Sequence, residues 1–339
     1  MSERKLHIIR QEYPMAPPEN LDLSSLNPAQ QEAVNHKKGP LLVIAGAGSG
    51  KTKTLTFRVA SLIQGGVDPR QILLLTFTRK AASNMLRRVE AMIGHSAQYV
   101  EGGTFHSLAL KTLRKYHEAI GFPSVFSILD RSDAEDLISQ IRQNYTKTDA
   151  KRFPKKNRIL DLISRHHNTG KPLPVIIQES QWAPYESELL QIAQEYKTMK
   201  RQIAAMDYDD LLLFLRELLT QHRDVAEALQ QQYPYILVDE YQDTNRVQSD
   251  ILKAMASNTA NIMAVGDDCQ SIYSFRGAHY RNIMDFPLEF SNTHQVKLEE
   301  NYRSTSAILA LSNAVMEQAK ESYHKTLFTN RASGEKPVY

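Results

Sequence analysis

The eight residues from Ala45 to Thr52, Ala-Gly-Ala-Gly-Ser-Gly-Lys-Thr, constrain the fold of this chain more than any other feature. They follow an apolar run that begins at Leu41 and precede a helical pattern that ends near Gln64. Glycines between a strand and a helix let backbone amides and the helix N-terminus converge on phosphate oxygens. Ala45 replaces the glycine that begins the general pattern, and a glycine-rich turn without nucleotide is the alternative. Lys51 and Thr52 directly after the last glycine favour a phosphate-binding loop.

Strand-like and helix-like patterns alternate on both sides of a long helical stretch. Apolar runs of strand type occur at Leu41 to Ala45, Ile72 to Thr76, Tyr235 to Val238 and Ile262 to Val265, with helical patterns at Lys51 to Gln64 and Arg79 to Ile93. This alternation predicts an α/β fold in which helices flank a parallel sheet. Because the pattern between Thr104 and Met206 is mostly helical, we expect a helical subdomain inserted into the sheet domain.

These patterns predict an N-terminal tail over residues 1–20, a discontinuous core over 21–106 and 207–280, a helical insertion over 107–206, and the incomplete start of a further domain over 281–339. The further domain is expected to open with a strand at Gln295 to Leu298 and a helix at Ser304 to Lys320. Ser304 and Asp207 are both placed to cap helices.

Composition narrows the class of protein. The 339 residues, 42% hydrophobic and 23% charged, fit about two globular domains and exclude a disordered or fibrous chain. No apolar run approaches the roughly 18 residues that cross a bilayer, and the first residues lack the apolar core of a signal peptide. With one cysteine, Cys269, the chain is expected to be cytoplasmic and to have no membrane contact.

Charge alone does not select a partner. The net charge of +3 permits a nucleic acid without requiring one. The segment from Asn144 to Lys171 is more basic, with Lys147, Lys151, Arg152, Lys155 and Lys156 among its cations. A phosphate-binding surface and a solvated loop beside a helix remain equally good interpretations of this segment.

Two adjacent carboxylates, Asp239 and Glu240, follow the apolar run Tyr235 to Val238. In an open parallel sheet, ligands bind at the carboxyl ends of the strands. Lys51 would reach the β and γ phosphates of a nucleotide, while Thr52 and Asp239 would hold Mg²⁺. Glu240 would then orient and deprotonate the attacking water. An ordinary polar turn is the alternative for the acidic pair.

Further motifs accompany these two in an order that resembles superfamily 1 DNA helicases of the UvrD, Rep and PcrA type, in their N-terminal half. The motifs are Leu26 to Val34, Thr76 to Ala82, Gly103 to His106, Val265 to Ala278 and Leu298 to Ser304. The resemblance extends from about Leu26 to the C-terminus. It implies a RecA-like nucleotide-binding core that uses ATP and Mg²⁺.

The resemblance also implies roles around the nucleotide. Gln30 would read adenine, although it can equally form a capping box at a helix start. Gln270 would sense the γ-phosphate, Tyr302 would stack on adenine, and Arg303 would act as an arginine finger. The implied catalytic residues are Lys51, Asp239, Glu240, Gln270 and Arg303, and the implied nucleotide contacts are Gln30, Ala47, Gly48, Ser49, Gly50, Lys51, Thr52, Lys53, Arg58, Tyr302 and Arg303.

Loops after the core strands are similar to the family's DNA contacts. The residues implied are Phe77, Thr78, Arg79, Thr104, Phe105, His106, Tyr273, Phe275 and Arg276. Arg79 stands where the family usually has asparagine, Phe275 where it has tryptophan, and Cys269 where aspartate is common. Phe77 is as readily a core residue.

The function implied is an ATP-driven motor that moves 3′ to 5′ on single-stranded DNA and acts at junctions of single and double strands. A module that binds ATP and DNA without moving is the alternative. The residues after Arg303, Ser304 to Tyr339, are expected to form one helix and at most one strand, which cannot build a second motor domain. We therefore expect this chain alone to hydrolyse ATP slowly and not to unwind duplex.

Overall fold

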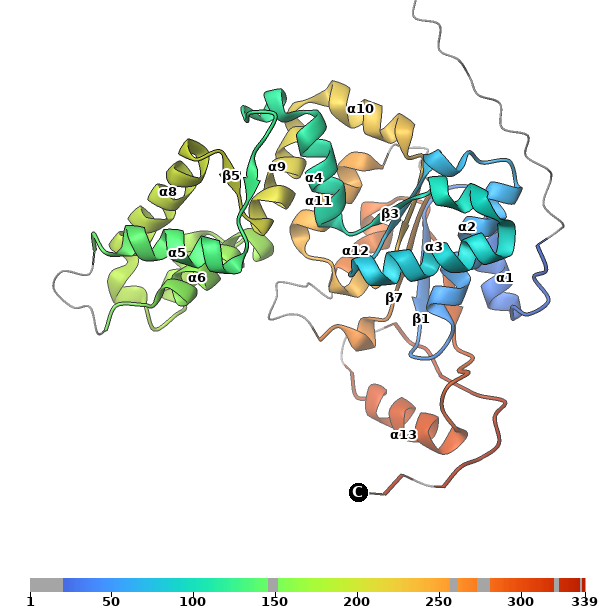
Figure 1. Ribbon diagram of the computed structural model, residues 1–339. Coiled ribbons are helices and arrows are strands. Elements are labelled where there is room, and N and C mark those ends of the chain that lie inside the picture. The colour runs from blue at the N-terminus through green and yellow to red at the C-terminus, as the bar shows by residue number, and fades with distance from the viewer. Residues whose placement is uncertain are drawn as a thin grey trace, which may run out of the picture.

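The computed structural model describes residues 21–145, 152–256, 261–272, 281–319, 323–335 and 337–338. Its centre is a six-stranded parallel sheet in the order β3-β2-β6-β7-β1-β8 (Figure 1). The strands are β1 (Leu41–Ala45), β2 (Ile72–Leu75), β3 (Glu101–Gly103), β6 (Tyr235–Val238), β7 (Asn261–Gly266) and β8 (His294–Leu298). The α/β prediction with a parallel sheet flanked by helices is therefore confirmed.

Helices cover both faces of this sheet. Successive residues of each strand point to opposite faces, so each strand contributes side chains to two separate apolar clusters. Leu42 and Ile44 of β1 join a buried cluster with α4 (Phe105–Lys115), α9 (Tyr208–Gln221), α10 (Arg223–Gln232), α11 (Arg246–Met255) and α12 (Arg281–Glu289). Leu41 and Val43 join a second cluster with α1 (Pro28–Asn35), α2 (Lys51–Gln64) and α3 (Arg79–Ile93). Burial on both faces explains why the strands are continuously apolar.

A helical lobe lies to one side of the sheet (Figure 1). It contains α5 (Arg131–Arg142), α6 (Lys156–Thr169), α7 (Leu173–Gln178) and α8 (Glu186–Gln202), packed around their own apolar cluster. Two short strands that pair in parallel, β4 (Ser127–Ile128) and β5 (Ala205–Met206), join the lobe to the core. The expected insertion over 107–206 included α4, but Leu108 and Leu113 of α4 pack in the core cluster of the sheet.

The expected boundary at residue 281 is wrong, because the segment that follows it completes the first sheet. Strand β8 pairs with β1 from Leu41↔His294 to Ala45↔Leu298. Ile283 and Phe286 of α12 are fully buried in the core cluster. Strand pattern identified β8 but could not identify its partner.

Helix α13 (Ser306–Met316) follows β8 and stands apart from the sheet (Figure 1). Its N-cap residue is Thr305 and not the expected Ser304, whose backbone amide instead donates to Asn301 Oδ1 at 2.6 Å. Asp207, by contrast, caps α9 as expected and forms a capping box with Asp210. Within the described part of the chain, the helices are too short or too polar to cross a membrane.

Candidate active site

The loop between β1 and α2 depends on glycine at two positions. Gly48 and Gly50 have φ angles of 72° and 89°, which L side chains rarely adopt. A Cβ on Gly50 would lie 2.6 Å from Gln30 Nε2, and one on Gly48 would lie 2.8 Å from the Cβ of Arg303. Gly50 is also the N-cap residue of α2. The loop therefore wraps closely while the first amides of α2 remain available to an anion.

Lys51 lies where three motifs meet. Its Nζ is 3.3 Å from Glu240 Oε2 and donates to Gln270 Oε1 at 3.4 Å. Only 11% of the lysine side chain is exposed. The strands before these residues, β1, β6 and β7, are neighbours in the sheet, so their carboxyl ends bring the three side chains together.

The acidic segment after β6 turns sharply at Glu240, whose φ of 50° and ψ of 47° lie in the left-handed region. The turn leads into the short 3-10 helix η5 (Tyr241–Asp243). Burial, followed by the charge of Glu240, raises the pKa of Asp239 to about 7. Burial also raises the pKa of Asp243 to about 6, and Glu240 adds to that shift.

Two carboxylate oxygens in this segment fit a cation site. Asp239 Oδ1 and Asp243 Oδ1 are buried and have no hydrogen-bond partner among the described residues. Both side chains line a cavity of about 680 Å³ with Thr52, Glu240 and other polar groups. Hydroxyl and carboxylate oxygens are the ligands that Mg²⁺ prefers, so the donor set fits the ion that the sequence implies.

A glutamine that the sequence analysis did not select, Gln242, connects the β6 and β7 motifs. Its Nε2 donates to Glu240 Oε2 at 2.8 Å, and its Oε1 accepts from the backbone amide of Asp267 at 3.0 Å. Gln270, at the end of η6 (Asp268–Gln270), donates through Nε2 to Asp267 Oδ2. Only the position of Gln242 in the acidic motif, two residues after Glu240, could have suggested it.

The turn after β8 lies directly on the phosphate loop. The backbone amide of Tyr302 donates to Gly48 O at 3.0 Å, and Asn301 Nδ2 donates to Ala47 O. Asn301, buried here, was not selected from the sequence. The half-exposed Tyr302 hydroxyl donates to Glu300 and accepts from Asn27. Arg303 is exposed beside Gly48, so the structure brings both residues expected at the nucleotide to the rim of the site.

Three other residues expected at the nucleotide contact protein instead. Gln30 is fully buried, donates to Ser49 O at 2.9 Å and forms a capping box with Asn27. Lys53 Nζ donates to Ser25 O at 2.6 Å. Arg58 is buried, donates to Val34 O at 2.8 Å, and lines a small cavity with Tyr235, at the opposite end of β6 from Asp239. Burial lowers the pKa of Arg58 to about 10. The predicted nucleotide contact of Arg58 is therefore wrong in this structure.

The expected DNA residues divide into exposed and buried groups. Phe77 is 45% exposed and lines the cavity that also contains Thr52 and Asp239. Arg79 is exposed at the first position of α3. Phe105 is only 5% exposed and belongs to the core cluster, so its burial favours a core role over the predicted contact with DNA. Its helical position explains this, since it begins the face of α4 that packs on α9.

The other residues that the sequence predicts to contact DNA either cap helices or pack beside the core. The hydroxyl oxygens of Thr78 and Thr104 cap α3 and α4. His106 packs edge-on against Tyr208, and burial lowers its pKa below the usual range. Tyr273, Phe275 and Arg276 lie outside the described residues.

Ion pairs neutralise part of the basic segment, on α6 and just after it. Lys156 pairs with Asp136 at 2.6 Å, Arg158 with Asp161 at 3.6 Å, and Lys171 with Glu179 at 2.9 Å. Lys147 and Lys151 lie outside the described residues. These pairs favour the interpretation of the segment as a solvated surface.

The chain matches one protein-family model and is similar in sequence to curated DNA helicases. The family model described as the UvrD/REP helicase N-terminal domain matches residues 26–291. The chain is 38% identical over 324 residues to "ATP-dependent DNA helicase PcrA" of Staphylococcus aureus, covering 94% of this chain and 44% of that protein. It is 41% identical over 318 residues to "Probable DNA helicase II homolog" of Rickettsia felis, covering 93% and 48%. The chain thus spans less than half the length of these curated relatives.

Proposed function

Because the chain belongs to the UvrD/Rep helicase family by its N-terminal domain, we propose that it binds and hydrolyses ATP and couples hydrolysis to 3′ to 5′ movement on single-stranded DNA. The observation that carries this proposal is the meeting of Lys51, Glu240 and Gln270, within 3.3 and 3.4 Å, at the carboxyl edge of the sheet. A cation at the end of a glycine-rich loop, together with a carboxylate and an amide that follow neighbouring strands, matches the requirements of phosphoryl transfer.

The chain's own groups can bind a triphosphate without large rearrangement. The amides at the start of α2 offer donors to phosphate oxygens, and Lys51 can exchange its contacts with Glu240 and Gln270 for the β and γ phosphates. Thr52 and Asp239 would hold Mg²⁺. When bound, this ion would neutralise charge on the phosphate oxygens. Asp239 Oδ1, which has no hydrogen-bond partner among the described residues, supports this role.

Glu240 is the group that can accept a proton from water. Its Oε2 accepts a hydrogen bond from Gln242, which fixes the carboxylate at the mouth of the cavity. Gln270 contacts Lys51 from the end of β7, and Arg303 is exposed beside Gly48. This arrangement lets Glu240 orient the water, Gln270 contact the γ-phosphate and Arg303 stabilise negative charge during transfer.

Nucleic acid would bind beside the nucleotide. Phe77 and the residues after β3 line a second cavity with Asp239 and Asp243, so the loops expected on DNA and the carboxylates share walls. A base stacked on Phe77, and phosphates held by Thr78 and Arg79, would be sensitive to movements at the ATP site. Single-stranded DNA and its junctions with duplex are the proposed substrates.

The test is ATP hydrolysis measured without nucleic acid and with single-stranded DNA, duplex DNA or RNA. Single-stranded DNA should stimulate hydrolysis most. Glu240→Gln should lower turnover by about 10² to 10⁴-fold, the usual contribution of general-base catalysis. It should bind nucleotide at least as tightly as the parent, since Lys51 loses a competing anion.

Lys51→Ala should instead weaken nucleotide binding, and Lys253→Ala, which removes a cation from α11, is the matched control. Parental hydrolysis by Glu240→Gln would show that another group activates the water. Hydrolysis that no nucleic acid stimulates would reduce the proposal to an ATP-binding module that does not move.

A further inference from the structure

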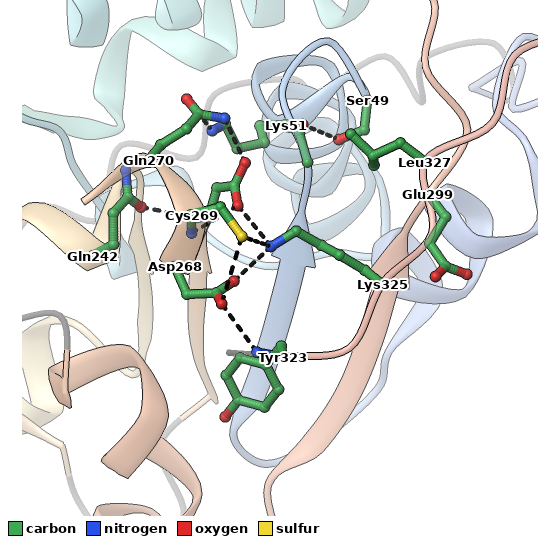
Figure 2. A network of polar contacts seen from close by, with 12 residues as sticks. Ser49, Lys51, Gln242, Asp268, Cys269, Gln270, Glu299, Tyr323, Lys325 and Leu327 are labelled. Atoms are coloured by element: carbon green, nitrogen blue, oxygen red, sulfur yellow. Dashed lines mark hydrogen bonds and ion pairs between the residues drawn. The ribbon is translucent and has the colours of Figure 1, made fainter. Parts of the chain in front are cut away.

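A segment near the C-terminus, residues 323–331 and here called the strap, crosses the carboxyl ends of β1, β7 and β8. The backbone amide of Phe328 donates to Glu299 O at 3.1 Å, and that of Asn301 donates to Phe328 O at 2.7 Å. The backbone amide of Tyr323 donates to Asp268 Oδ2 at 3.0 Å. Figure 2 shows the strap side chains reaching toward the phosphate loop and the end of β7.

Lys325 is the buried cation of the strap. Its Nζ lies 2.7 Å from Asp267 Oδ1 and 2.5 Å from Asp268 Oδ1, and the lysine side chain is 6% exposed. It also lies 3.2 Å from Cys269 Sγ. The side-chain ligand atoms of Asp267, Asp268 and Cys269 lie within 4.8 Å of one another, close enough to hold a metal ion. The ammonium group of Lys325 already supplies the positive charge that this acidic cluster needs.

The two oxygens of Asp267 link Lys325 to the nucleotide site. Oδ1 contacts Lys325 and accepts from the backbone amide of Cys269 at 3.2 Å, while Oδ2 accepts from Gln270 Nε2. The oxygen of the same side-chain amide, Gln270 Oε1, accepts a hydrogen bond from Lys51 Nζ. Since Asp267 is 2% exposed, water offers little alternative to these contacts. The position of Lys325 thus fixes the carboxylate that orients Gln270.

The strap also contacts the phosphate loop and the turn that bears Arg303. A Cβ on Gly46 would overlap the Leu327 side chain, so Leu327 packs directly against the loop backbone. Arg331 donates to the carbonyl oxygens of Tyr302 and Arg303 at 3.2 and 2.7 Å. One segment therefore contacts both sides of the site, through Lys325 on one and Arg331 on the other.

We propose that Lys325 is a positioning residue for ATP hydrolysis, which holds Asp267 so that the Gln270 amide faces the γ-phosphate position beside Lys51. This inference rests on the proposed ATPase function. Lys325 does not touch the phosphates and acts only through Asp267 and Gln270. Its loss should therefore affect the step that needs Gln270 and leave contacts to the rest of the nucleotide in place.

The first experiment compares Lys325→Met with Lys297→Met. Lys297 Nζ donates to the strap at His324 O but is exposed and does not contact Asp267, so it is the matched control. Lys325→Met should lower kcat roughly ten- to a hundredfold, the range expected when a group is displaced by about an ångström. ADP affinity should stay within about threefold of the parent, because ADP lacks the phosphate that Gln270 faces. Lys297→Met should behave as the parent.

A double-mutant cycle separates positioning from a general loss of structure. If Lys325 acts through Gln270, then Lys325→Met should add little to the kcat loss of Gln270→Ala. Lys325→Arg, which keeps the charge, should recover part of the activity. Additive losses in the cycle, or equal losses of kcat and ADP affinity, would overturn the proposal.

Two further variants keep the test decisive. If Lys325→Met fails to fold, the double variant Lys325→Met with Asp268→Asn removes one of the unpaired charges and should show the same kcat defect. Asp268→Asn alone leaves the link from Lys325 through Asp267 to Gln270 intact and should hydrolyse ATP almost as the parent. If Gln270→Ala lowers kcat but folded Lys325 variants do not, only this inference fails. If the parent itself does not hydrolyse ATP, the proposed function fails.

Discussion

At the scale of single residues, Glu240 shows how the site depends on backbone conformation. A non-glycine residue in the left-handed region costs on the order of 1 to 3 kcal/mol and persists where surrounding structure enforces it. At Glu240 the buried strand β6 and the buried Tyr241 on either side hold the turn. The turn directs the carboxylate toward Lys51, so local strain is exchanged for a defined catalytic geometry.

The pKa of Asp239 gives the site a defined pH dependence. Mg²⁺ needs the ionised carboxylate, and burial beside Glu240 raises the pKa of Asp239 to about 7. Protons should therefore compete below that pH, and the apparent Mg²⁺ affinity should fall by up to about tenfold per pH unit between about pH 7 and 5. Calorimetric titration of Mg²⁺ with ADP present checks this. An affinity that does not change over this range would contradict the metal role of Asp239.

When no ion is bound, Asp239 should make the folded protein more stable at low pH, whereas its Mg²⁺ affinity should fall at low pH. Its folded pKa is raised from 3.8, so the folded protein holds this proton more tightly than the unfolded chain. The stability gained is complete below pH 3.8 and is lost as the pH rises through about 7. Asp239→Asn should remove this contribution, as shown by the difference in unfolding free energy between parent and variant across that range.

Two phenylalanines predicted on DNA should respond differently to truncation. Phe77→Ala should weaken single-stranded DNA binding by about 1 to 3 kcal/mol, the value of one stacked base, with little effect on stability. Phe105→Ala should cost about 3 to 5 kcal/mol of unfolding free energy, because it opens a cavity in the core. DNA anisotropy and urea unfolding of both variants give the comparison. A large loss of DNA affinity in folded Phe105→Ala would contradict its assignment to the core.

Sequence pattern located the charged centre of the site better than its supports. Lys51, Asp239, Glu240 and Gln270 each end or follow a core strand, and a parallel sheet brings such positions to one edge. Asn301 and Lys325 act on segments far away in the chain, so their contacts depend on the fold and leave no local signal. For the same reason the pattern could not show that Arg58 lies at the opposite end of β6.

At the scale of elements, periodicity gave the type and bounds of strands and helices more reliably than their neighbours. The predicted bounds of β1, β6, α2 and α3 are confirmed, because glycine and proline mark their ends or apolar runs define them. The assignment of β8 to a new domain was wrong, because the apolar pattern of a strand does not indicate which strand it pairs with. Likewise, only packing shows that α4 belongs to the sheet domain and α5 to the lobe.

The start of α9 offers a test of one element. Asp207 caps the helix, accepts from Tyr196 Oη at 2.8 Å and contacts Lys200 Nζ at 2.6 Å. Asp207→Ala should cost about 3 to 5 kcal/mol of unfolding free energy, because it breaks a buried pair and removes a cap. Asp130→Ala removes the exposed cap of α5 and should cost only about 1 kcal/mol. Equal losses in urea unfolding would show that burial of the α9 cap adds nothing.

At the scale of the whole molecule, the distribution of paired charges predicts which surface would bind nucleic acid if the proposed function is correct. Arg79→Ala should flatten the slope of log affinity against log salt by about 0.7, as expected when one contact to a single-strand phosphate is lost. Lys156→Ala should leave the slope unchanged, because Lys156 is paired with Asp136 on the lobe. Titrations of labelled single-stranded DNA over a salt series measure both slopes. A larger change in Lys156→Ala would move the binding surface to the lobe.

The place of β1 between β7 and β8 has a consequence for how the chain is made. Both of its partners begin late, β7 at residue 261 and β8 at residue 294. At synthesis rates of about 5 to 20 residues per second, the ribosome needs on the order of ten to fifty seconds after β1 to reach these two strands. The lobe, which has its own apolar cluster, can fold in that interval, while the apolar β1 still lacks both strands with which it pairs. A nascent or truncated chain that ends before Asn261 carries the complete phosphate-loop sequence without either strand that pairs with β1, so this early motif is among the last parts of the site to take its final shape.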